Sequence, residues 1–441
     1  MPRTPRKFLP RLRKRLRDSL LIVPLIGLIG GWALASGAIQ LDTFIYELDE
    51  RWQDVDLRDL WFLRTAADLG AAAKAALGTM SSAMLTFIGV VFSISLVALQ
   101  MAAGQFTPRV VRIYIESWVT KTTLAVFLCT FLYTLRVQKE YASGNDANDT
   151  VVPYVGASLA MGFMVASLVL FVVYVNSTVR LMRVTHVMDR VTRESLRLIE
   201  TLPGADGAGE EPAHTCDLSQ AAVLAHRGRP GVLQAVHEHR AVRLAERQGL
   251  TLHLVPQAGD YLCPGEPLFL VCGGGPDPGP DLQQAVVDIG VERTTEQDVG
   301  FGLRQLVDIA VRALSAAVND PTTAVQSLDR IQVLLAALAR RPLGMLVHRD
   351  GEGVVRLVVT TPQWPELLDL ALSEIQDYGI DSAQVTRRLA ALFDALDRSV
   401  PDGRRAALAA RRARLEEAVR RSQPDVERRE FALHADRQGI G

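Results

Sequence analysis

The stretch SSAMLTFIGVVFSISLVALQMAAGQFTPRVVR, residues 81 to 112, decides the fold class of this chain. As far as about residue 103 it is apolar enough to enter a lipid bilayer, yet hydroxyl and amide side chains recur along it. A helix of roughly 20 apolar residues spans a bilayer, and this stretch supplies one. The chain therefore contains a membrane-spanning helix, and its polar positions are the first candidates for function.

Three more segments of the 441-residue chain have the length and composition of spans, and most charged residues follow residue 180. We therefore expect an α-helical polytopic membrane domain with four transmembrane helices, followed by a mixed α+β, mostly helical cytoplasmic domain. The expected spans are residues 19–40, 77–103, 121–137 and 153–179.

The charges on the segments between the spans alternate in sign. Residues 1–18 form a basic N-terminus, the loop after the first span is acidic from Asp42 onward, and Arg109 and Arg112 follow the second span. Basic residues flanking spans stay on the cytoplasmic side. The pattern predicts a multi-pass membrane protein with both termini cytoplasmic.

The chain after the fourth span divides into segments of different composition and periodicity. The fourth span continues into LMRVTHVMDRVTRESLRLIETL, expected to be a stalk, and PGADGAGEEPAHT reads as a linker. GVLQAV and TLHLVP are expected strands, and GDYLCPGEPLFLV an expected hairpin. The expected boundaries are 19–180 for the membrane domain, 181–214 for the stalk helix and linker, 215–275 for a small β-rich module, and 281–441 for a helical domain with one β-hairpin at 345–360.

On a helix, one line of small and polar residues runs along the second span. One explanation is close helix packing, because small residues let backbones approach in lipid. The other is a hydrated path lined by neutral hydroxyls from several subunits, since no ionisable residue lies between 77 and 103. The line comprises Gly78, Ser82, Thr86, Gly89, Ser93 and Gln100.

A turn follows this line. Thr107 suits a helix N-cap and Pro108 the first helical position, so a new amphipathic helix is expected to begin at Arg109 and to include Arg112. It is either a plain connector or an elbow at the inner mouth of the path.

The second half contains one distinctive stretch, RTTEQDVGFGLRQLVDIAVRALSAAVNDPTTAVQSLDRI. A helix is expected over about 296–317, with Arg304, Asp308 and Arg312 at steps of four. These three form either a structural ion network, or a site for an anion or a neighbouring subunit.

The segment NDPTTA is expected to end that helix and start another. Pro321 cannot continue a helix, and Asp320 can cap the next one at Thr322 and Thr323. The alternative is an exposed ligand site that includes Asn319.

Several function classes lack support. No basic run interleaved with aromatic residues indicates nucleic-acid binding. The four cysteines show no C-x-x-C pairing and favour a reducing compartment without a disulfide framework. His237, Glu238 and His239 are adjacent and do not face one another, so neither a metal nor another cofactor is indicated. No P-loop, G-x-S-x-G, H-E-x-x-H or dinucleotide fingerprint marks an enzyme.

GVVFSISLVALQMAAGQFTPRVVR together with RTTEQDVGFGLRQLVDIAVRALSAAVNDPTTAV resembles the bacterial membrane proteins known as domain of unknown function 2254. The resemblance covers nearly the whole chain. It implies a polytopic inner-membrane protein with a cytoplasmic domain, and it carries no established reaction, ligand or catalytic residue.

Three hypotheses follow. The first is a homo-oligomeric channel or permeation protein whose second helix lines the path for an unidentified small ion or ligand. The second is a membrane-anchored regulatory or sensing protein without transport activity. An enzyme acting on a lipid substrate ranks last, because no catalytic motif supports it.

Overall fold

The structure is a computed structural model that describes residues 22–51, 70–105, 117–142, 154–203, 218–273 and 279–438. The chain divides into two compact units, Met1–Arg183 and Val184–Gly441.

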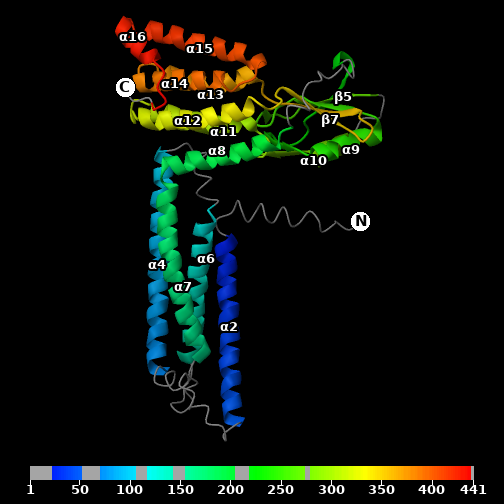
Figure 1. Ribbon diagram of the computed structural model, residues 1–441. Helices are drawn as coiled ribbons and strands as arrows, with labels where there is room; N and C mark the ends of the chain where they lie inside the picture. The colour runs from blue at the N-terminus through cyan, green and yellow to red at the C-terminus, as the bar shows by residue number, and fades with distance from the viewer. Residues whose placement is uncertain are drawn as a thin grey trace. The chain divides into compact units, whose positions relative to one another are not determined.

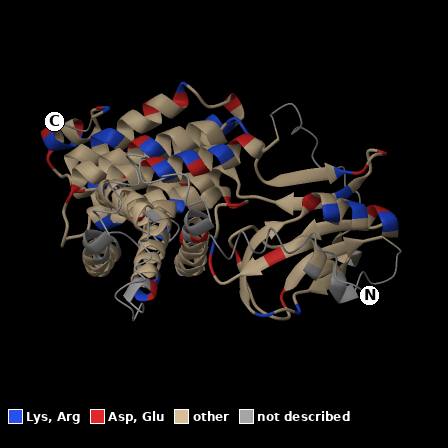
Figure 2. Cartoon of the chain, turned by 90° about the horizontal axis from the view of Figure 1, so that it is seen from below, with Lys and Arg blue, Asp and Glu red and all other residues tan. Residues whose placement is uncertain are grey.

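The first unit contains the expected four apolar helices, which lie side by side (Figure 1). Figure 2 shows them nearly free of charged residues along their described length. The third helix is longer than the expected 121–137, and the first continues well beyond residue 40. The helices are α2 (Ile22–Arg51), α4 (Gly70–Gln105), α6 (Trp118–Ala142) and α7 (Tyr154–Leu181).

Glycines bring α2 and α6 into close contact. A Cβ atom added at Gly27 would lie 2.8 Å from the Cα atom of Ala125, and one at Gly31 would lie 2.9 Å from the Cα atom of Cys129. Both pairs advance by four residues in the same direction, so α2 and α6 run parallel. Small residues four apart allow this approach between helices in lipid.

Asp42 belongs to α2 rather than to a loop, which corrects the expectation from the charge pattern. Its carboxylate is 3% exposed and accepts hydrogen bonds from the backbone N–H groups of Val155 (2.8 Å) and Gly156 (2.9 Å). These groups begin α7, where a helix leaves donors unsatisfied and favours negative charge. Asp42 therefore caps a helix from a neighbouring element.

Helices of the second unit stack in layers (Figure 1). They are α8 (Val184–Thr201), α11 (Val299–Ala313), α12 (Pro321–Leu338), α13 (Trp364–Gly379), α14 (Ala383–Asp397), α15 (Asp402–Ser422) and α16 (Val426–Leu433). α8 packs on α11 and α12, which in turn pack on α13 and α14. α15 and α16 cover the outer side of α13 and α14.

Two sheets, α9 (Glu238–Gln248) and α10 (Gly279–Val286) form the rest of this unit. The larger sheet has the order β1-β5-β3-β8-β7 and the smaller one the order β4-β2-β6. Buried leucines, valines and Phe269 from both sheets share one apolar core with α9 and α10. The strands are β1 (Ala222–Ala225), β2 (Gly231–Val236), β3 (Thr251–Leu254), β4 (Tyr261–Leu262), β5 (Pro267–Cys272), β6 (Val287–Gly290), β7 (Met345–Arg349) and β8 (Val355–Thr360).

The strand pairing corrects two expectations. The hairpin at 345–360 forms as expected, but β8 pairs in parallel with β3, so the hairpin completes the sheet of the β-rich region. β4 and β5 do not pair with each other, because β4 joins β2 while β5 lies between β1 and β3.

Two further expectations need correction. The fourth span does not continue unbroken as a stalk: α7 ends at Leu181, and α8 begins at Val184 as a packed helix of the second unit. The strongly one-sided apolar pattern of α8, which includes buried Val187 and Val191, explains why it packs rather than stands free. Cys272 is disulfide-bonded, whereas Cys129 and Cys263 are free.

Candidate functional site

The small and polar line of α4 lies on the outside of the four-helix unit. Gly78 is half-buried near Gln138, whereas the other five residues of the line are exposed. A Cβ atom added at Gly89 would meet no atom of the described chain within 4 Å. Packing against the described helices therefore does not account for the line from Ser82 to Gln100, and we call the whole line, Gly78 included, the α4 stripe.

The opposite face of α4 packs against the other helices. Leu77, Met84 and Val91 are buried there, at angles nearly opposite to Ser82 and Gly89 on the helix. Apolar packing thus fixes the rotation of α4 and turns the stripe outward.

Hydroxyl groups of the stripe bond to their own helix. The Ser82 hydroxyl donates to the Gly78 carbonyl (3.1 Å), and the Thr86 hydroxyl donates to the Ser82 carbonyl (3.1 Å). Such bonds satisfy the donor, while each oxygen keeps lone pairs for water or another polar group. The stripe can therefore face a polar partner without needing one to satisfy its donors.

A second set of polar groups lies inside the unit, and sequence reasoning missed it. Ser81 donates to the Thr134 hydroxyl (2.9 Å), and Thr130 and Ser167 share a hydrogen bond of 3.2 Å, all among buried side chains. Each pair joins two helices. These bonds fasten neighbouring helices of the described chain to one another.

A second outward line of small residues runs along α7. Ser158, Gly162 and Ala166 are exposed at steps of four, and an added Cβ at Gly162 would meet no described atom within 4 Å. Larger exposed residues, Val165 and Val169, interrupt this line. The α7 line is a competing surface for contact between copies.

The expected elbow falls outside the described residues. Thr107, Pro108, Arg109 and Arg112 lie between Gln105 and Ser117, the bounds of the described segments on either side. Its assignment to the inner mouth of the path stays a prediction.

Arg304 forms an ion network within the chain. Its Nε donates to Asp308 (2.6 Å), and both terminal nitrogens of its guanidinium donate to Glu374 on α13. These bonds raise the pKa of Arg304 and lower that of Glu374. Arg312 is half-buried further along α11. Because its guanidinium is already engaged, Arg304 fastens α11 to α13 rather than offering an anion site.

Asp320 caps α12 as expected. Its carboxylate accepts from the Thr323 N–H (3.0 Å) and from the Thr323 hydroxyl (2.6 Å), with Pro321 in the first turn. Asn319, which is exposed, has a positive φ of 48° between the two helices. Thr322 is exposed on the first turn of α12. The local geometry supports the capping interpretation.

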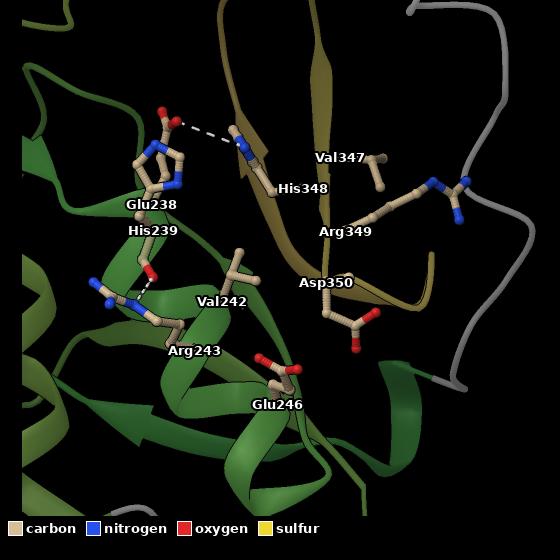
Figure 3. A pocket seen from close by; sticks show the side chains of 10 residues that line it. Glu238, His239, Val242, Arg243, Glu246, Val347, His348, Arg349 and Asp350 are labelled. Carbon is tan, nitrogen blue, oxygen red and sulfur yellow. Dashed lines mark hydrogen bonds and ion pairs between the residues drawn. The ribbon is translucent and has the colours of Figure 1, made fainter.

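The adjacent residues His237, Glu238 and His239 have separate environments. His237 lies 3.3 Å from Asp288, and Glu238 lies 3.6 Å from Nδ1 of His348. Figure 3 shows the second pair at a cavity of about 690 Å³ between α9 and the end of β7. Among the described residues, no three His, Cys, Asp or Glu side chains could hold a metal ion together.

Charges of both signs line this cavity, which favours no single class of ligand. Glu238, Arg243 and Glu246 lie on α9, and Arg349 lies across from them at the end of β7 (Figure 3). Asp350 is engaged by Arg356 at 2.7 Å, and this contact lowers the pKa of Asp350.

Comparison with known proteins places the chain among membrane proteins. The family model described as "Predicted membrane protein (DUF2254)" matches residues 17–395. An uncharacterized protein of Mycobacterium bovis and one of Mycobacterium tuberculosis are each 32% identical over 375 residues, which cover 82% of this chain and 71% of the relative. No solved structure matches the chain significantly.

Proposed function

Because the chain belongs to the DUF2254 family of predicted membrane proteins, we propose that it is an oligomeric channel or permeation protein of the bacterial inner membrane. Several copies bring their α4 helices around one axis, and the second unit assembles or gates them. One observation carries this proposal: the α4 stripe faces outward, and no described part of the chain covers it from Ser82 to Gln100.

Physical chemistry supports a polar neighbour for the stripe. The exposed carboxamide of Gln100 loses its hydrogen bonds to water if it faces hydrocarbon. At Gly89 the missing side chain lets another backbone, or a file of water, approach the helix closely. Neutral hydroxyls such as that of Ser93 suit a path without a fixed charge.

The proposed topology places both termini and the second unit in the cytoplasm. The alternation of basic and acidic segments supports it. The disulfide at Cys272 opposes it, because disulfides persist mainly in oxidising compartments. Reporter fusions at both termini decide the matter, together with external labelling of Glu47→Cys and Asn145→Cys. A C-terminal reporter active only outside the cytoplasm would refute the topology.

Cysteine substitution separates a water-lined path from a lipid-facing surface. In a background with both free cysteines of the described residues replaced, Cys129→Ser and Cys263→Ser, the variants Ser82→Cys and Ser93→Cys should react in membranes with small charged thiol reagents. Val90→Cys and Phe92→Cys are the matched controls, because these residues are also exposed on α4 but lie on either side of the stripe. If the stripe cysteines react no faster than the control cysteines, the stripe does not line a water-filled path.

The alternative function is a membrane-anchored sensor without transport. The open cavity between α9 and β7 favours it, because a soluble unit that carries cavities can bind ligands (Figure 3). Purified protein that conducts nothing in liposomes, but whose second unit binds a small molecule, would support this function instead.

A further inference from the structure

A cavity of about 420 Å³ lies between α13 and α15. Arginines outnumber carboxylates in its lining: Arg411, Arg414 and Arg421 come from α15, against Glu417 alone. Gln376 of α13 completes the polar lining. The cavity is within the range of small-molecule sites and carries a net positive lining.

Arg411 is a buried cation whose guanidinium lacks hydrogen-bond partners at two of its nitrogens. Its side chain is 7% exposed, and its Nε and Nη2 atoms have no hydrogen-bond partner among the described residues. Asp369 approaches Nε at 3.7 Å, which is beyond hydrogen-bond range. Burial accordingly lowers the pKa of Arg411. By contrast, the equally buried Arg388 donates to Asp329 at 2.8 Å and to Gln332 at 2.7 Å.

Two of the carboxylates near Arg411 are engaged by other arginines, and Asp377 adds a third negative charge near it. Asp369 accepts from Nη1 of Arg414 at 3.2 Å, and Glu417 accepts from Nη1 of Arg420 at 3.0 Å. The Nε atom of Arg421 lies 3.9 Å from the nearest carboxylate oxygen of Glu417, which is too far for a hydrogen bond. The exposed guanidinium of Arg421 is therefore available to a ligand, and the buried charge of Arg411 lies beneath it at the cavity.

We propose that this cavity binds the phosphate group of a small phosphate monoester, with Arg411 at its base and Arg414 and Arg421 at its rim. Guanidinium groups offer forked donors that match phosphate oxygens, and a dianion with three terminal oxygens can engage more than one of them. The positive charge of Arg411, held in a largely buried position at the base, would attract the phosphate at short range. This inference does not depend on the permeation proposal.

Titration of the full chain in detergent tests the proposal. We expect inorganic phosphate and adenosine monophosphate to raise the melting temperature saturably at constant ionic strength, whereas chloride does not. Arg414→Gln and Arg421→Gln should each weaken the apparent affinity about tenfold, because each removes a charged donor. Arg405→Gln, on the same helix but paired with Asp402 outside the cavity, should bind as the wild type does.

Arg411→Gln distinguishes a binding role from a structural one. Removing a buried charge that lacks hydrogen bonds at Nε and Nη2 should leave the melting temperature without phosphate unchanged or higher, and should abolish the shift with phosphate. A large loss of stability without phosphate would overturn the proposal, as would no phosphate-dependent shift in the wild type, or rim variants that bind as Arg405→Gln does.

A second titration distinguishes a lipid headgroup from a soluble metabolite as the phosphate ligand. Dihexanoyl phosphatidic acid, a water-soluble lipid, is titrated beside adenosine monophosphate. Tenfold tighter binding of the lipid, lost in Arg421→Gln, supports the site and assigns it to a lipid headgroup. The reverse order supports the site and assigns it to a soluble metabolite.

Discussion

The contact between α2 and α6 yields a quantitative prediction for the glycine at its centre. A Cβ atom at Gly31 would lie 2.9 Å from the Cα atom of Cys129 and closer still to its carbonyl oxygen. Both are backbone atoms, so no side chain can turn away, and the helices must separate by roughly 0.5–1 Å to restore normal contact distances. Overpacking of this kind costs about 1–3 kcal/mol. Gly31→Ala should therefore destabilise the four-helix unit by about 2 kcal/mol.

Thermal denaturation in one detergent measures this effect against a matched control. A loss of about 2 kcal/mol corresponds to a melting temperature lower by roughly 4–8 °C for a unit of this size. Gly30→Ala is the control, because an added Cβ there would meet no described atom within 4 Å on the same helix. Equal melting temperatures for the two variants would refute the packing of α2 against α6 through Gly31.

Three further predictions concern single contacts. Asp320→Ala should destabilise the protein by about 1 kcal/mol in thermal denaturation while Asp320→Ser restores most of it, since Ser also caps; equal losses would contradict the capping role. Asp42→Ala should cost about 1–2 kcal/mol and Asp42→Asn less, because Asn still accepts from the N-terminus of α7; unchanged stability in both would remove Asp42 from that role. Arg304 holds the pKa of Glu374 below its ordinary value, so this contribution to stability is complete at neutral pH and is lost as pH falls below about 4.3. Glu374→Gln should therefore flatten the acid side of the stability profile, and parallel profiles for variant and wild type would contradict the ion pair.

Local patterns in the sequence predict local structure here. The four apolar helices, the hairpin after Leu346 and the cap at Asp320 each depend on residues within a few positions of one another. The motif Gly27-x-x-x-Gly31 was also readable as a packing signal. The two glycines occupy a single turn of the first span, whereas the small and polar line of the second span extends over about six turns from Gly78 to Gln100.

The errors come from contacts between distant residues. The parallel pairing of Leu252 with Leu357 joins segments about one hundred residues apart, and no local period reports it. The engagement of Arg304 by Glu374 likewise depends on how α13 packs on α11. The break at Met182 and Arg183 carries no Gly or Pro signal, so a continuous helix was the reasonable expectation.

The outward position of the stripe could be predicted only in part. The sequence places Ser82, Thr86, Gly89 and Ser93 on one face, but it cannot say whether another helix of the same chain covers that face. In the structure the opposite, apolar face of α4 is buried, so no described helix covers the stripe. The sequence analysis did not predict the comparable outward line around Gly162 on α7.

Flux through purified protein in liposomes tests the permeation proposal most directly. Potassium, sodium and chloride release are followed in turn from vesicles that contain the wild type, Gly89→Trp or Gly162→Trp. Both glycines lie on outward faces with no described atom within 4 Å of an added Cβ, so neither substitution should disturb the fold of the unit. If α4 lines the path, at least one ion leaks through the wild type, and Gly89→Trp blocks it while Gly162→Trp does not. Absence of flux from wild-type vesicles with all three ions, or a block by Gly162→Trp alone, would contradict the account.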